Sequence, residues 1–285
     1  MDLRRSSQLA VPLVRGAALG ALLCLGGPGG GVALQACASS GGDSTTGKRV
    51  VLHTRAMVSE EAQSTFSNSF GWRISLTEAA TSAGPFYYFD GAPPLAVRHE
   101  RSSWQYAARW LGLGMAHAHP GHYQAGNAMG QMLEASSLDL LAGEAELPDG
   151  EGVTGTYRSA RFTLGDPTGP AAKILDGHAA LAEGVAEKDG EEPRYFRATA
   201  DLAEIAEHAA DGKVEGCELE EVDVDGDGTI TITIDPVVWF DLVDFSEADL
   251  GNPDEPAELP VDSQPRIAFA LGVTQLSAYK FRYSP

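Results

Sequence analysis

The sequence predicts an all-β fold, a single antiparallel β-sandwich domain with a few short helices, from three observations. Strand-like segments bounded by Gly, Pro, Asp and Asn recur along the chain, while helical periodicity is weak. Residues 72–76 and 229–234 alternate apolar and polar side chains, as in an antiparallel sheet that packs on one face. Many short strands with few helices are typical of two packed sheets.

The expected strands are 49–54, 71–77, 86–89, 153–164, 194–201, 229–235, 266–271 and 274–283. Short helices are expected at 127–133, where Met129, Met132 and Leu133 have helical spacing, and at 200–210. The sequence shows no internal repeat and no clear interdomain linker, so residues 49–285 are expected to form one domain.

Residues 1–36 have the pattern of a secretory signal peptide. Arg4, Arg5 and Arg15 give a positive start, and the apolar stretch 16–34 follows. Proline and glycine residues interrupt that stretch, which favours a signal peptide over a membrane-spanning helix.

The signal ends in Leu-Gln-Ala-Cys at Cys37, which resembles the lipobox of bacterial lipoproteins. The resemblance implies that the preceding peptide is removed and that Cys37 is lipidated. Residues 38–48 are rich in Gly, Ser and Thr and predict a flexible tether between the lipid and the domain. Ala38, after the cysteine, implies sorting to the outer membrane of the cell envelope, facing the periplasm. The alternative is an ordinary cleaved signal peptide with an incidental cysteine.

The charge of the chain limits the kinds of partner that it is expected to bind. The full chain carries a formal charge of −20, and the chain after residue 36 carries 17 basic and 39 acidic residues, or −22. Such a surface repels nucleic acid and anionic lipid headgroups and favours cations or basic partners.

With Cys37 lipidated, Cys217 is the one cysteine left after the predicted signal peptide is removed, and it cannot form an intrachain disulfide. Cys217 is therefore either a buried apolar residue or a free thiol.

The most informative stretch is a histidine cluster. His117, His119 and His122 are three of the seven histidines, and extended backbone would put Met115, His117 and His119 on one face. A turn at Pro120 would bring His122 back toward the same point. Imidazole and thioether donors suit copper or zinc, so these four residues are the predicted metal ligands. Met129 and Met132 are either further ligands or core residues, and an exposed His-rich loop without a metal is the alternative to the whole site.

The spacing His117-x-His119-x-x-His122 also resembles the first zinc motif of metallo-β-lactamase-type hydrolases. Gly121 stands where that family carries Asp, although His178 and His208 could supply downstream ligands. A zinc hydrolase is therefore an alternative function. Otherwise the sequence has no Gly-x-Ser-x-Gly elbow, phosphate-binding loop or paired-Cys motif, which favours a protein that is not an enzyme.

A second candidate cation site is an Asp-rich turn. Asp223, Asp225 and Asp227, followed by Gly228, resemble the opening of an EF-hand calcium loop, but the position of its last ligand holds Ile234. Asp-Gly between the apparent strands 221–224 and 229–231 instead predicts a β-hairpin, with calcium in its turn as an alternative.

Over the mature domain the chain also resembles periplasmic β-sandwich lipoproteins of metal-handling loci, such as the copper-associated partner protein of methanobactin systems. The resemblance lies in residues 70–79, the histidine cluster with 155–157 after it, and the Asp-Gly turn leading to Trp239. It implies the periplasm, a β-sandwich and a copper role. The resulting hypothesis is a membrane-anchored lipoprotein that captures or transfers copper or zinc, and the alternative is a structural or interaction lipoprotein that contacts an envelope protein.

Overall fold

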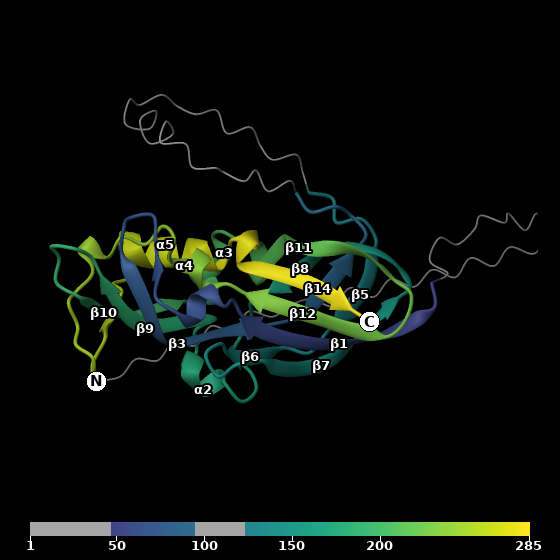
Figure 1. Ribbon diagram of the computed structural model, residues 1–285, viewed down its shortest axis with the longest axis horizontal. Coiled ribbons are helices and arrows are strands. Elements are labelled where there is room, and N and C mark those ends of the chain that lie inside the picture. The colour runs from purple at the N-terminus through teal and green to yellow at the C-terminus, as the bar shows by residue number, and fades with distance from the viewer. Residues whose placement is uncertain (1–46, 95–122) are drawn as a thin grey trace, which may run out of the picture. The chain divides into compact units, whose positions relative to one another are not determined.

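The computed structural model describes residues 47–94 and 123–285, which lie within one compact unit, Ser44–Pro285 (Figure 1). Its largest element is a closed barrel in which each strand is hydrogen-bonded to the next. In order around the barrel the strands are β1 (Arg49–Val58), β12 (Gly228–Ile234), β14 (Tyr279–Ser284), β11 (Lys213–Val224), β8 (Gly155–Thr163), β4 (Phe86–Phe89), β5 (Ala128–Met132) and β7 (Ala145–Val153).

A second sheet continues the fold at the other end of the view in Figure 1. Its strands in order are β13 (Ala257–Glu258), β10 (Arg194–Ala200), β9 (Ala180–Glu187), β3 (Arg73–Ala83) and β2 (Phe66–Ser67), and β6 (Ser136–Asp139) pairs with β3 off this path. The helices are short: α2 (Ala172–Leu175), α3 (Leu202–Ala206), α4 (Pro236–Phe240) and α5 (Gln264–Val273), with 3₁₀ turns η1 (Glu61–Gln63), η2 (Ala210–Gly212), η3 (Phe245–Glu247) and η4 (Leu276–Ala278). Among the described residues no helix is both long and apolar enough to cross a membrane.

The prediction of a single antiparallel β-sandwich is wrong, although the β-rich character is confirmed. β1 pairs in parallel with β12 on one side and antiparallel with β7 on the other, which closes the first sheet on itself. Two further pairs, β11 with β14 and β10 with β13, are also parallel. Alternation along a strand reveals one buried face, but a flat sheet and a closed one produce the same alternation. Closure depends on pairs far apart in sequence.

The predicted hairpin at the Asp-Gly turn is also wrong. β11 and β12 are consecutive in the chain and joined by a short turn, but β14 lies between them (Figure 1). β14 pairs in parallel with β11 and antiparallel with β12. The turn residues favour a reversal of the chain, but the C-terminal strand occupies the position that a hairpin partner would take.

Two segments have the opposite secondary structure to the one that the sequence predicts. The expected helix at 127–133 is strand β5, in which Gly130 and Met132 are buried while Met129 and Gln131 alternate with them. The expected strand at 266–271 lies within α5, which begins after Ser263. The Ser263 hydroxyl accepts a hydrogen bond from the Arg266 amide at 3.4 Å, and proline stands in the first turn. Most of α5 is buried, which hides its helical period from a sequence pattern.

The barrel is filled by its own side chains. Tyr88 and Phe86 both pack edge-on against Phe281, with ring centroids 6.1 and 6.0 Å apart, and Phe162 stacks on Tyr279 at 3.9 Å. All five rings are at most 2% exposed. An eight-stranded barrel is just wide enough for such a filling, so ligands must bind at its outer face or its ends.

Candidate functional site at the base of residues 95–122

The predicted metal ligands Met115, His117, His119 and His122, and the predicted lipidation site Cys37, lie outside the described residues. The structure does describe the residues on either side of 95–122, and these show where that part of the chain leaves the barrel and where it returns. We call the described residues on either side of 95–122, together with the strand residues they contact, the base of this segment.

The base is formed by the neighbouring strands β4 and β5. Beyond the paired residues Phe89 and Ala128, the Asp90 carboxylate accepts hydrogen bonds from the backbone amide and the side-chain amide of Asn127, at 2.7 and 2.9 Å. The Gly91 amide then donates to the Ala125 carbonyl at 2.9 Å. These contacts hold the chain after β4 and the chain before β5 side by side, as far as Gly91 and Ala125.

Gly216 supports both ends. It lies at an irregularity in the pairing of β11 with β8 and has φ +81°, a conformation that favours glycine. A Cβ atom at this position would lie 2.5 Å from Cδ of Pro94 and 3.4 Å from Cε2 of Tyr123. Pro94 and Tyr123 flank residues 95–122, and both of these flanking residues lie against one point on the outer barrel wall.

A chain of hydroxyl groups completes the base. The Ser159 hydroxyl donates to the Gly91 carbonyl at 2.6 Å, and the Tyr123 hydroxyl donates to Ser159 Oγ at 2.7 Å. Burial raises the pKa of Tyr123, so the phenol is neutral at physiological pH. A neutral phenol is a poor ligand for a soft metal, and Tyr123 here has a positioning contact instead.

An arginine–aromatic cluster lies beside this base. The Arg161 guanidinium lies 5.3 Å from the ring centroid of Tyr87 and 5.4 Å from that of Phe89, both on β4. It also pairs with the Glu215 carboxylate at 2.6 Å, next to Gly216 in sequence. Cation–π contacts and an ion pair together fix the outer surface of β4, β8 and β11 at this point.

Cys217 faces the other way, into the core, where it is fully buried. Its thiol donates to the Val214 carbonyl at 3.3 Å, and burial raises its pKa to about 12. The thiol is therefore protonated at neutral pH, whereas the thiolate is the metal-binding form. Of the two alternatives predicted for Cys217, the buried apolar residue is confirmed.

In the Asp-rich turn, two of the three predicted calcium ligands accept hydrogen bonds from neighbouring strands. Asp223 accepts a hydrogen bond from the Thr156 hydroxyl at 2.5 Å, while Asp227 accepts one from the Val51 amide at 2.8 Å, so the two carboxylates are tied to different strands. Within the described ranges, no group of three or more His, Cys, Asp or Glu residues is arranged to hold a metal ion. Calcium at Asp223, Asp225 and Asp227 stays a prediction.

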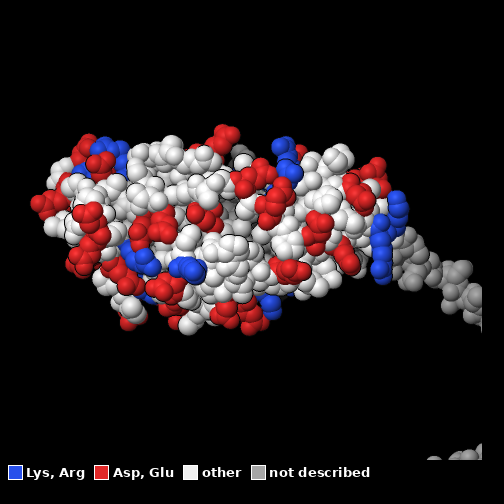
Figure 2. Space-filling view, turned by 90° about the horizontal axis from the view of Figure 1, so that it is seen from below, with Lys and Arg blue, Asp and Glu red and all other residues white. Residues whose placement is uncertain are grey.

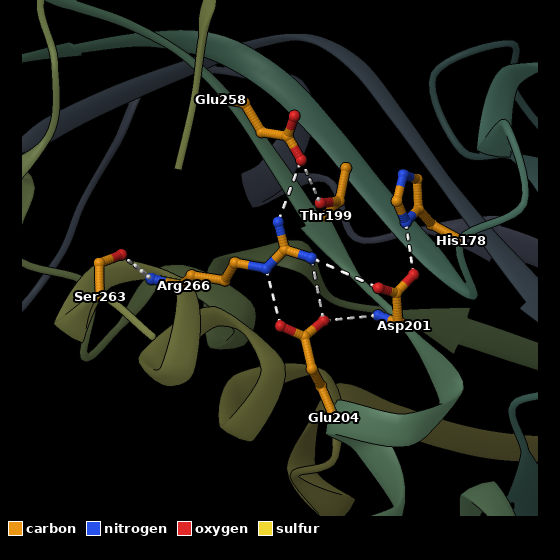
Figure 3. Close-up of polar contacts among 7 residues, drawn as sticks. All are labelled: His178, Thr199, Asp201, Glu204, Glu258, Ser263 and Arg266. Carbon is orange, nitrogen blue, oxygen red and sulfur yellow. Dashed lines mark hydrogen bonds and ion pairs between the residues drawn. The ribbon is translucent and has the colours of Figure 1, made fainter. Parts of the chain in front are cut away.

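Among the described residues, the most buried charged side chain is Arg266, on helix α5 beside the second sheet (Figure 3). Arg266, on α5, is 4% exposed and donates to Glu204 at the start of α3 and to Glu258 of β13. Asp201 caps α3, lies 3.5 Å from Arg266, and also contacts the His178 ring at 2.6 Å. In the described part of the chain, no Ser, Thr or Cys side chain is hydrogen-bonded to His178.

No protein-family model, curated protein or solved structure matches this chain. Sequence reasoning missed Gly216, although an isolated glycine inside a strand pattern is a known signal for a bulge. It also missed Arg266, whose neighbours Ser263 and Pro265 carry the signal for a helix start.

Proposed function

We propose that this protein is a membrane-anchored, periplasm-facing lipoprotein that binds copper or zinc through His117, His119 and His122, with Met115 as a further ligand. The protein captures or passes on the ion without catalysis. The observation that carries the proposal is the convergence of Pro94 and Tyr123, the two residues that flank 95–122, on Gly216 at the wall of a filled barrel.

Such a base supports metal binding because it reduces the freedom of the chain that carries the ligands. A segment whose ends are held together has already lost part of the entropy that closing a loop around an ion would cost. The barrel beneath is rigid, since buried rings fill it. Ligands on a loop positioned by a rigid scaffold are a common arrangement for binding sites.

The surface charge supports a cationic ligand. Figure 2 shows acidic side chains spread over the face in view, with fewer basic ones among them. The chain carries 40 Asp and Glu against 20 Lys and Arg, and a field of this sign raises the local concentration of cations. This effect is general and does not distinguish copper from zinc.

The experiment offers copper and zinc separately to the purified protein, removes unbound metal, and measures the retained metal by mass spectrometry. We expect near-stoichiometric retention of one of the two metals, lost in the double variant His117→Ala, His119→Ala. The control is His53→Ala, which removes an exposed histidine of β1. Retention that survives the first double variant would overturn the site.

The titration should also depend on pH. Protonated imidazole cannot coordinate a metal, so affinity should weaken as the pH falls below about 6.5. A titration that is flat from pH 7 to pH 5 would exclude a site dominated by histidine. Hydrolytic turnover that disappears on chelation would favour the zinc hydrolase instead.

A second candidate, an interaction lipoprotein, is favoured by exposed apolar side chains around α4 and α5. Leu242 and Ile267 are 47% and 50% exposed, and the side-chain amide of Gln264, one turn before Ile267, donates to the Leu242 carbonyl. Exposed apolar residues close together are common in protein interfaces. If neither metal is retained, capture of envelope proteins by the wild type but not by Leu242→Ser, Ile267→Ser would support this function.

A further inference from the structure

A groove of about 630 Å³ lies on the barrel where β1, β7 and β5 run side by side, near the first described residues. Its size falls within the usual range for sites that bind small ligands. The residues that line it include Arg49, Val51, Met129, Gln131, Glu151 and Asp227.

Strand register shows which side chains share its outer surface. Val51 lies opposite Glu151 on the neighbouring strand, and Glu151 lies opposite Gln131 on the next, so the three form one row across the barrel. Arg49 lies opposite Val153, one step along the same face. Because buried and solvent-facing residues alternate in these strands, this row and the Arg49–Val153 pair face outward together.

Among the described arginines, Arg49 is distinguished by the absence of an ion pair with another described residue. Every other arginine in the described part of the chain forms an ion pair with a carboxylate, as the pairs of Arg158 with Glu221 and Arg282 with Glu220 illustrate. Within the same ranges, the Arg49 guanidinium has neither an ion pair nor a hydrogen bond. In a domain this acidic, an arginine left unpaired beside a groove is available to an anionic ligand group.

Two further polar groups in the groove are also available. Within the described residues, the side chains of Gln131 and Glu151 have no hydrogen-bond or ion-pair partner. The groove therefore offers a guanidinium, an amide and the carboxylate of Glu151, while its second carboxylate, that of Asp227, already accepts a hydrogen bond from the Val51 amide. Between these groups lie apolar side chains, including Val51, which is 40% exposed.

We propose that this groove binds a short peptide in its zwitterionic form. Arg49 would bind the terminal carboxylate through its planar fork of donors, and Glu151 would bind the terminal ammonium. The Gln131 amide would bond to the peptide backbone, and Val51 with Met129 would contact an apolar side chain. The proposal does not depend on metal binding.

The test titrates the full chain with alanyl-leucyl-alanine by calorimetry and compares the same tripeptide with its carboxyl group amidated or its amine acetylated. We expect the free tripeptide to bind and each blocked form to bind at least about tenfold more weakly, the loss of one charge-assisted contact. Arg49→Ala should weaken binding of the free tripeptide and abolish the preference for the free tripeptide over the form with an amidated carboxyl group. Glu151→Gln should also weaken binding of the free tripeptide, and it should abolish the preference for the free tripeptide over the form with an acetylated amine.

Arg55→Ala is the matched control, because Arg55 lies on the same face of β1 but pairs with Glu144 and Glu146 outside the groove. It should leave binding unchanged, and far-ultraviolet circular dichroism should show that all three variants are folded. Three results would each overturn the proposal: no binding to the wild type, equal binding of blocked and free peptides, or unchanged selectivity in Arg49→Ala and Glu151→Gln.

Discussion

Arg266 and Glu204 are joined side by side by two hydrogen bonds, from Nε to Oε1 at 2.7 Å and from Nη2 to Oε2 at 3.2 Å (Figure 3). The arginine comes from α5 and the glutamate from the first turn of α3, where its other contact is with the backbone amide of Asp201. This bidentate pair fixes α5 against α3, and the contact of Arg266 with Glu258 joins α5 to β13 of the second sheet. Burial lowers the pKa of Arg266, but the neighbouring glutamates outweigh that effect and raise it.

Replacing Arg266 by Met should destabilise the protein by about 1–3 kcal/mol, because the carboxylates around the guanidinium lose their partner but are each at least a quarter exposed to water. Urea denaturation at pH 7 measures the loss. Arg282→Met is the control, since Arg282 pairs with Glu220 at a site where both side chains are more than two-thirds exposed. That pair should contribute less than about 1 kcal/mol. Equal losses in the two variants would show that burial of Arg266 has no energetic consequence.

Gly216→Ala tests the base of residues 95–122. The substitution adds strain at φ +81° and places a methyl group against Pro94. We expect a loss of roughly 1–3 kcal/mol in the free energy of unfolding and, if the proposed function is right, weaker copper or zinc binding.

Gly190→Ala separates the two effects in that experiment. Gly190 has a similar φ of +86°, but a Cβ atom there would meet nothing within 4 Å. It should therefore lose stability through strain alone and retain full metal affinity. Metal binding that is unchanged in Gly216→Ala would separate the base from the metal site.

Cys217 should resist thiol reagents in the folded protein. With a pKa of about 12, roughly one thiol in ten thousand is ionised at pH 8, and burial blocks access to it. Labelling with a chromogenic disulfide at pH 8 should be more than about a hundredfold slower in buffer than in concentrated urea. Rapid labelling of the folded protein would mean that β11 opens readily near Gly216.

The sequence was informative where a strand buries one face. The alternation in residues 229–234 predicted β12 almost to the residue, and 86–89 matched β4. It was misleading where the local pattern is shared by two structures. The fully apolar run around Phe269 is equally compatible with a buried helix, and Met129 and Met132 have spacing that a strand also allows.

Long-range features could not be predicted at all. Neither the position of β14 between β11 and β12 nor the closure of the barrel through β1 has a local signal, because both depend on pairs far apart in the chain. The same holds for the candidate site. Nothing near Gly216 in the sequence shows that Pro94 and Tyr123 contact it, and Arg49 looks like any other exposed arginine until the partners of the rest are known.

Tyr157 should govern part of the stability at high pH. Its buried hydroxyl contacts the Met129 carbonyl at 2.7 Å and the Val153 carbonyl at 2.9 Å, and it accepts a hydrogen bond from the Val153 amide at 3.2 Å. Burial raises its pKa to about 12, above the value near 10 of an unfolded tyrosine. Because the folded state retains this proton longer, its contribution to stability is complete below pH 10 and is lost as the pH rises toward 12.

Tyr157→Phe should therefore lower the free energy of unfolding by about 1–3 kcal/mol at pH 8, because it leaves buried backbone groups unpaired. The difference from wild type should shrink between pH 10 and pH 12, where wild type loses the contribution that the variant never had. Urea denaturation at pH 8, 10 and 11 measures both effects, with Tyr195→Phe, a half-buried tyrosine of β10, as the control. A difference that stays constant up to pH 11 or grows with pH would show that the Tyr157 proton is not held by the fold.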